Sequence, residues 1–320
     1  MSCQASRFAN LPAWRVPSWV SALALVSCLT QRAAAQACCA GTGVVTPGRL
    51  ALHESALVGV QLKAAAEIGS FDAHGRYAAL TRGGSELDLE QDAFAAVRLN
   101  RHAQAALLLP VLETRRTSAT QSEFGGGFGD ANLNLRYDFT FAGATKTIPG
   151  LGILAGITFP TGTPADSSRI RPLATDATGI GAFQASLGLA VEQVFGPWLV
   201  NLTGVVAQRT ARTVSQSGIT IHEHLAAQWT ALGAVGYVFP SEAALALSAS
   251  YTAEGNATID GATAPDSSHR TTTVTFAGLL PLSDSWRAQA ALFQNVPIST
   301  LSVNQPALLG GSLTAVYAWL

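Results

Sequence analysis

The chain has 320 residues, a length that could hold two soluble domains. Only 12% of the residues are charged, and the mean hydropathy of +0.27 is high for a soluble protein. No uncharged apolar run reaches the roughly 20 residues that a membrane-spanning helix needs, which excludes a helical multispan transporter. Two Lys and 17 Arg offer no basic patch for nucleic acid, so a secreted all-β protein or a closed membrane barrel is left.

The N-terminus has the features of an export signal. Two arginines precede a short apolar stretch at residues 16–29, and Ala35-Gln36-Ala37 is a small-x-small cleavage site. We therefore expect residues 1–37 to be a signal peptide and residues 38–56 to be a flexible N-terminal segment. Removing the signal takes away three Arg and no acidic residue, which leaves the mature chain with an excess of four negative charges.

Two cysteines, Cys38 and Cys39, would then lie at the new N-terminus. One hypothesis is that Cys38 carries a lipid, although Gln36 stands where a lipoprotein signal has a small residue. The alternative is a mobile tail whose adjacent cysteines stay free or pair externally. The other two cysteines leave with the signal, so no disulfide framework is available to hold the fold.

The mature chain alternates with a period of two residues. From Asp130 to Phe141, apolar side chains such as Leu133 and Leu135 stand at odd positions, and polar side chains stand between them. Residues 58–68 repeat the pattern. Because successive side chains of a strand point to opposite faces, each such segment is predicted to be a strand with one apolar and one polar face.

Twelve segments of this kind are predicted strands. They cover residues 57–68, 86–99, 103–114, 129–142, 150–160, 180–195, 197–208, 225–239, 242–254, 270–281, 285–295 and 309–320. Short joins alternate with longer polar stretches between them, as in outer-membrane barrels with short periplasmic turns and longer external loops. The sequence therefore predicts an all-β fold, an up-and-down transmembrane antiparallel β-barrel of about 12 strands over residues 57–320, located in the cell outer membrane.

Aromatic residues give a partly independent test of this arrangement. Those expected near the short-turn end are Tyr137, Phe139, Phe141, Phe195, Trp198, Tyr237, Phe239, Trp286, Tyr317 and Trp319. Phe159, Phe183 and Tyr251 are expected near the other end, whereas Trp229 falls in mid-strand and Phe94 points inward. Two aromatic bands mark the two membrane–water boundaries of a barrel. The alternative is a soluble β-sandwich, which would alternate too but needs neither aromatic bands nor unequal loops.

One stretch carries a family resemblance. Gly125-Gly126-Gly127-Phe128-Gly129-Asp130, followed by an alternating strand to Arg136-Tyr137, resembles the G-x-G-D and R-Y pattern of a large bacterial family. The next predicted strand closes on Pro160-Thr161-Gly162, similar to the P-T-G ending in that family. These proteins are outer-membrane β-barrels of the "MetA-pathway of phenol degradation", a transporter type. The resemblance covers about residues 125–200 and implies a barrel with a transport role.

The last predicted strand resembles the signal that barrel-assembly machinery reads, because Tyr317 and Trp319 alternate near the C-terminus. Leu320 after the final aromatic residue departs from that pattern. We therefore expect the partners to be the barrel-assembly machinery, outer-membrane lipid and a small-molecule solute, with no nucleic acid among them.

If the apolar faces meet lipid, the polar faces line a lumen. The charged residues that point inward by phase are Lys63, Glu67, Asp88, Glu90, Asp92, Arg98, Arg136, Asp138, Glu192 and Arg287. Asp88, Glu90 and Asp92 are consecutive inward positions that would repel one another, which predicts a cation such as Arg98 or Arg136 across the lumen. One interpretation is a constriction that favours cations, and the other is a structural ladder of ion pairs.

Other chemistry has weaker support in the sequence. His222 and His224 would share a face of a strand, but a structural metal site needs three or four ligands, so no metal is expected. Ser267 or Ser268 with His269 suggests a hydrolase, but adjacent side chains on a strand point apart. We expect neither enzymatic activity nor a cofactor.

The predicted function is that of an outer-membrane channel or transporter for passive or facilitated passage of small molecules, hydrophobic or aromatic ones among them. Twelve strands lie between barrels of about eight, which side chains fill, and those of 16–18, which form open channels. One alternative is a non-conducting structural or adhesion barrel whose external loops at 161–179 and 255–269 bind a ligand. A more remote alternative is an outer-membrane hydrolase.

Overall fold

The computed structural model describes residues 48–80, 84–145, 147–165, 171–216 and 219–320. The predicted signal peptide, Cys38 and Cys39 lie outside these residues. The described part of the chain is built from β-strands, and none of its segments is a helix long and apolar enough to cross a membrane.

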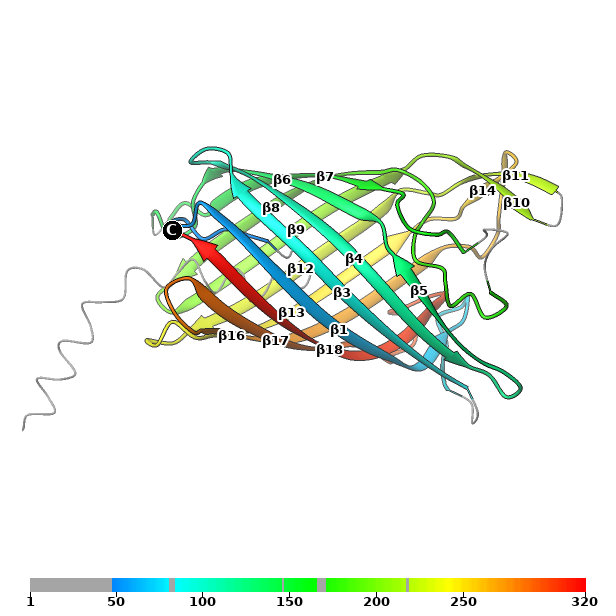
Figure 1. The fold of residues 1–320 in the computed structure, drawn as a ribbon. Helices are drawn as coiled ribbons and strands as arrows, with labels where there is room; N and C mark the ends of the chain where they lie inside the picture. Colours follow the sequence, from blue (N-terminus) through cyan, green and yellow to red (C-terminus); the bar gives the residue numbers. More distant parts are fainter. Residues whose placement is uncertain (1–47, 81–83, 146, 166–170, 217–218) are drawn as a thin grey trace, which may run out of the picture.

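Twelve long antiparallel strands form a closed barrel (Figure 1). They are β1 (Ala56–Phe71), β3 (Ser85–Arg98), β4 (Ala103–Thr117), β6 (Ala131–Thr140), β7 (Gly150–Phe159), β8 (Gln184–Phe195), β9 (Trp198–Arg209), β12 (Gln228–Val238), β13 (Ala244–Glu254), β16 (His269–Pro281), β17 (Trp286–Asn295) and β18 (Gln305–Trp319). Each strand pairs with the next, and β18 pairs with β1 along its whole length. The predicted all-β, up-and-down barrel of 12 strands is confirmed, and each predicted segment overlaps one of these strands.

The alternation of the sequence becomes the two faces of the wall. On β1, the side chain of Leu62 is 56% exposed on the outside, whereas Gln61 is 6% exposed on the inside. On β9, Leu202 is exposed and Asn201 is buried in the same way. A row of exposed Leu, Val, Ile and Phe side chains would be unfavourable in water but is what hydrocarbon requires. The exterior is therefore the lipid-facing surface.

Short turns join the strands at one end of the barrel, and longer loops join them at the other. The C-terminus lies at the short-turn end (Figure 1). Six short strands that the sequence analysis left in loops add to the long-loop side. They are β2 (Tyr77–Ala79), β5 (Ser122–Phe128), β10 (Arg212–Gln216), β11 (Ile219–His224), β14 (Thr258–Ile259) and β15 (Ala262–Thr263). The last four form a small sheet that ties two external loops together.

Aromatic rings form a band around the short-turn end, as predicted. Ring pairs with centroids 4.8 to 5.1 Å apart are Trp286–Tyr317, Tyr317–Trp319, Trp198–Tyr237 and Tyr237–Phe239. Phe159 and Phe183 pack together at the long-loop end. The mid-strand placement of Trp229 is wrong, because β12 begins at Gln228, so this exposed ring lies at the long-loop end instead. Both membrane boundaries therefore carry aromatic side chains.

Inside the short-turn end, Phe94 of β3 points inward as its phase predicts and is 5% exposed. Its ring lies over Gly59, the residue directly opposite on β1. A Cβ atom at position 59 would overlap Cζ of Phe94, so only glycine leaves room for the ring. The pair places an apolar surface inside the barrel near the N-terminal segment.

Adjacent residues on β9 test the two faces. Leu202→Arg should lower the free energy of unfolding by about 2–4 kcal/mol, because the charge would enter hydrocarbon near the bilayer midplane. Thr203→Arg should cost much less, since Thr203 lines an internal cavity. Urea unfolding in lipid vesicles, followed by tryptophan fluorescence, measures both variants. Equal losses of stability would contradict the assignment of the faces.

Candidate functional site in the barrel lumen

The described part of the N-terminal segment enters the short-turn end of the barrel. Residues 48–55, here called the N-terminal strap, lie inside the wall rather than outside it. The strap residue Leu50 is buried, and its amide donates to Oε1 of Gln104 at 3.2 Å. The inward side chains that pack with Leu50 in one apolar cluster are Leu57, Phe94, Ala96, Val316 and Ala318. The sequence predicts flexibility for residues 38–56; the strap is held in place from Gly48 onward, and residues 38–47 lie outside the described residues.

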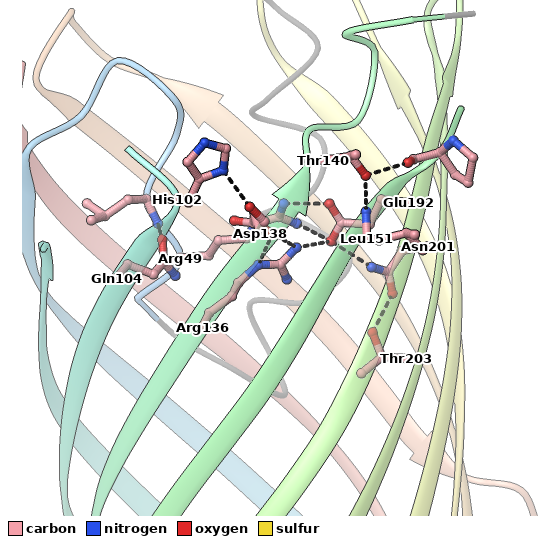
Figure 2. A network of polar contacts seen from close by, with 12 residues as sticks. Arg49, His102, Gln104, Arg136, Asp138, Thr140, Leu151, Glu192, Asn201 and Thr203 are labelled. Carbon is pink, nitrogen blue, oxygen red and sulfur yellow. Dashed lines mark hydrogen bonds and ion pairs between the residues drawn. The ribbon is translucent and has the colours of Figure 1, made fainter. Parts of the chain in front are cut away.

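The first anchor of the strap is Arg49. Its guanidinium donates two hydrogen bonds of 2.5 Å to the carboxylate of Glu192 on β8 (Figure 2). Arg136 on β6 donates to the same carboxylate at 3.1 Å and to Asp138 at 2.8 Å, and Asn201 on β9 donates to it at 2.9 Å. The buried carboxylate of Glu192 is therefore surrounded by donors, which a buried charge requires.

A glycine on β7 gives this network its space. Because β7 lies between β6 and β8, an inward side chain at this level would separate Arg136 from Glu192. A Cβ atom at Gly152 would lie 2.8 Å from Oδ1 of Asp138 and 3.2 Å from Nη2 of Arg136. The glycine therefore lets charged groups from two non-adjacent strands meet over the strand between them.

The second anchor of the strap is Glu54. Its carboxylate is paired with Arg287 of β17, and both side chains are buried. The same carboxylate accepts the amide of Ala51 at 2.7 Å, which closes a tight turn within the strap. Arg98 of β3 donates to the backbone oxygens of Glu54 at 2.8 Å and of Ala51 at 2.5 Å. The strap therefore supplies acceptors to two inward arginines of the wall.

The structure thus gives five of the predicted lumen residues one shared environment. Arg98, Arg136, Asp138, Glu192 and Arg287 all lie against the strap or in its first anchor. The sequence analysis missed their partners Arg49 and Glu54, because both precede the first strand, where alternation does not assign an inward or outward direction to a side chain. One feature of the sequence could have indicated them: Arg49 and Glu54 are the only Lys, Arg, Asp or Glu residues between the predicted signal peptide and the first strand.

The other five predicted lumen residues lie on neighbouring strands, above the strap. These are Lys63, Glu67, Asp88, Glu90 and Asp92. Lys63 pairs with Glu90 at 2.8 Å, and Asp88 accepts the hydroxyl of Thr114 at 2.8 Å. The sequence suggests Arg98, Arg136 or another cation as the partner of the acidic row. In the structure both arginines bond to the strap and its anchor. Cations on adjacent strands serve instead, since neighbouring inward side chains are within reach.

Arg116 of β4, which the sequence analysis did not select, is the second of these cations. It pairs with Glu86 of β3 at 2.8 Å and donates to the backbone oxygen of Leu173 at 2.9 Å, which fixes an inward part of the loop between β7 and β8. Glu67 lies near enough to Glu86 and Arg116 for electrostatic interaction. We call the inward side of β1, β3 and β4 the acidic face.

A cavity of about 430 Å³ lies between the strap and the long-loop end. Arg49 and Arg136 border it on the strap side, and Glu90 borders it from the acidic face. Asp130, directly before β6, is a further charged residue of the lining. The uncharged polar side chains that line it are Gln104, Asn132, Asn134, Thr158, Gln184, Ser186, Thr203, Gln228 and Thr230. Leu108, Leu154 and Leu232 are among its apolar lining. Its volume and mixed lining are typical of a site for a small molecule.

The weaker candidates take part in loop structure. His222 and His224 stand on the exposed side of β11, and across the described residues no three metal-ligating side chains converge. Ser267 donates to the backbone oxygen of Ala264 at 2.8 Å, and Nδ1 of His269 lies 2.9 Å from the backbone oxygen of Asn304. Ser267 and His269 are therefore engaged with backbone rather than with each other.

Comparison with solved structures identifies the type of fold. The crystal structure of an outer membrane channel from Pseudomonas putida F1 matches with a TM-score of 0.67 and 16% identity, covering 83% of this chain and 96% of that one. The translocator domain of the autotransporter NalP from Neisseria meningitidis matches with a TM-score of 0.48 and 12% identity, covering 94% and 98%. No protein-family model and no curated protein matches the chain. With its apolar exterior, the fold is that of an outer-membrane β-barrel.

The role of Gly152 in the Glu192 network can be tested directly. Gly152→Val should lower the free energy of unfolding by about 1–3 kcal/mol, because the side chain would overlap Asp138 and displace Arg136. Gly204→Val on the outer face of β9 is the matched control, since nothing lies within 4 Å of a Cβ atom there. The temperature at which gel mobility shifts from folded to unfolded reports both. If Gly204→Val is as unstable as Gly152→Val, the loss of stability comes from replacing any strand glycine, and the role of Gly152 in the Glu192 network is contradicted.

Proposed function

We propose that the protein is an outer-membrane channel for small molecules, with a periplasmic end closed by the N-terminal strap. The observation that carries this proposal is the cavity of about 430 Å³, lined by both polar and apolar side chains, directly above the strap. A barrel that served only as a scaffold would gain stability from filling this space, whereas a conduit needs a wetted space along its axis. The short-turn end faces the periplasm in barrels of this type.

The strap is suited to opening because it belongs to the chain end and not to the wall. The hydrogen bonds that pair the twelve wall strands with one another are kept when residues 48–55 leave the lumen. At the rim, the strap gives up two backbone hydrogen bonds, from the N–H of Ser55 to the oxygen of Trp319 and from the N–H of Arg98 to the oxygen of Ser55. Glu192 would retain Arg136 and Asn201 as donors after losing Arg49, so one anchor can open without leaving its carboxylate alone. The strap therefore supports a closed and an open state of one barrel.

The resemblance to barrels of the phenol-degradation pathway supports a transport role and small, hydrophobic or aromatic solutes. The apolar residues among the cavity lining, such as Leu108 and Leu154, are compatible with a solute that has an apolar part. Export by a signal peptide over residues 1–37, insertion by the barrel-assembly machinery and contact with outer-membrane lipid belong to the same proposal. It includes no enzymatic activity, cofactor or nucleic acid.

An external binding role is the second candidate. The four-stranded sheet of β10, β11, β14 and β15 joins two long loops into one ordered surface, which a ligand-binding scaffold would need. A channel and a scaffold differ in conductance, and this difference decides between them.

Releasing the strap should open the channel. Arg49→Ala/Leu50→Ser removes the Glu192 anchor and the apolar contact of the strap, and single-channel conductance in planar bilayers should rise by roughly an order of magnitude as the lumen clears. Leu52→Ser, an exposed strap position, is the control and should conduct like the unmodified protein.

Two results would count against this proposal. Folded protein that stays silent in both the unmodified and the released form would show that the barrel is not a channel. An increase of the same size in Leu52→Ser would show that the strap is not the barrier.

A further inference from the structure

The acidic face carries an excess of negative charge that the rest of the lumen does not share. Its carboxylates are Glu67, Glu86, Asp88, Glu90 and Asp92. Only Lys63 and Arg116 oppose them on these strands, which leaves three carboxylates without a cation. At the strap end, by contrast, arginine and carboxylate side chains form the buried pairs of the two anchors.

One carboxylate of the acidic face, that of Asp92, has an oxygen atom without a hydrogen-bond partner among the described residues. Asp92 is 4% exposed, and this atom is its Oδ1. Leaving a buried acceptor unsatisfied is costly, and more so for a charged group. The nearest inward position on the same strand, Glu90, shares its carboxylate with a single ammonium, that of Lys63. The carboxylates of Asp92 and Glu90 therefore have room for a further hydrogen-bond donor or positive charge.

The acidic face is reached from the cavity. Glu90 borders the cavity, and Asp92 follows it at the next inward position of β3 towards the strap. Across the cavity the lining is mostly uncharged, with amides such as Asn134 and hydroxyls such as Thr203 and Thr230. Asp130 also lines this side, and its carboxylate accepts the backbone amides of Gly162 and Ile180. A solute in this space meets the carboxylate of Glu90 on the side of the acidic face, and mainly neutral groups on the other side.

The nearby arginines do not offset this charge. Arg49 and Arg136 also border the cavity, but their guanidinium groups are paired with Glu192 and Asp138. Their positive charge is therefore largely compensated within the strap anchor, whereas the carboxylates of the acidic face stay in excess. An anion entering the cavity would meet no comparable excess of cations.

From this arrangement we propose that the lumen selects small hydroxylated organic cations, such as amino sugars. The ammonium group would lie at Glu90, which borders the cavity, with Asp92 as the next carboxylate behind it, and the hydroxyl groups would face Asn134, Thr203 and Thr230. This inference rests on the proposed channel function, but it takes the solute class from the charges of the lumen and replaces the hydrophobic or aromatic solutes that the family resemblance implies. Charged side chains that line a pore set its ion selectivity in this way.

Reversal potentials across planar bilayers test the proposal with the full-length mature protein. In a KCl gradient the permeability ratio of K⁺ to Cl⁻ should be at least about threefold in favour of K⁺, because each uncompensated carboxylate attracts cations into the lumen. Glucosamine hydrochloride should likewise give a cation-selective potential. In proteoliposome uptake, glucosamine should enter several-fold faster than N-acetylglucosamine, and glucuronate should be slowest.

Neutralising the acidic row is the decisive variant. D88N/E90Q/D92N should bring the permeability ratio close to one and remove the order among the three sugars, with each side-chain shape kept. E242Q/D284N removes two exposed carboxylates from the short turns and should leave the ratio unchanged. Heat-dependent gel mobility reports folding, and D92N alone replaces the triple variant if the latter does not fold, with a smaller shift expected in the same direction.

The outcomes separate the two proposals. If no solute or ion passes, even with Arg49→Ala/Leu50→Ser, the channel function itself fails. If ions pass with no preference or with preference for Cl⁻, the channel stands and the selection of cations is overturned. The selection of cations is overturned as well if D88N/E90Q/D92N keeps the original ratio, or if E242Q/D284N shifts it equally.

Discussion

The structure depends on one constraint, that no backbone N–H or C=O group can remain unpaired in hydrocarbon. A twelve-stranded sheet satisfies it only by joining its last strand to its first, and the register from Ala56↔Trp319 to Phe71↔Gln305 does so. Closure then divides every strand into a lipid face and a lumen face. A charged residue at an inward phase has no route to bulk water except along the axis. Its partners must therefore come from adjacent strands, from the chain end or from whatever enters the lumen.

The strap follows from the same constraint. Twelve strands enclose more space than their side chains fill, so the periplasmic end needs additional atoms to be closed. Leu50 contributes apolar contact with Phe94 and Val316, and Arg49 and Glu54 contribute charge that matches arginines and carboxylates already on the wall. Removing one partner of such a buried pair generally costs about 3–5 kcal/mol, although replacing the whole pair with apolar residues can be neutral. The paired charges therefore specify where the strap lies more than they add stability.

Much of this architecture could be predicted from the sequence, because the phase of a strand is a local property. All twelve strands and the inward direction of residues such as Asp92 and Arg136 follow from alternation alone. What alternation cannot predict is which side chains meet across strands. Arg136 reaches Glu192 only because Gly152 leaves β7 bare between them, and this needs the register of three strands. Arg49 and Glu54 stand outside any strand, and the predicted start of β12 at 225 is too early, which misplaces Trp229.

The barrel axis divides into two parts with different chemistry, and this division decides what the lumen can do. At the short-turn end, inward residues are either apolar, as in the cluster of Leu199, Val238 and Leu279, or charged groups that are paired at the strap, such as Glu192 and Arg287. The wall therefore packs closely around the strap. Above it, inward positions turn to amides, hydroxyls and carboxylates, which hold water. Apolar residues at inward phase on β16, such as Leu279, are therefore part of the seal rather than irregularities in the pattern. In the proposed channel, a solute would be bound and selected in the upper part and would pass the lower part only when the strap moves.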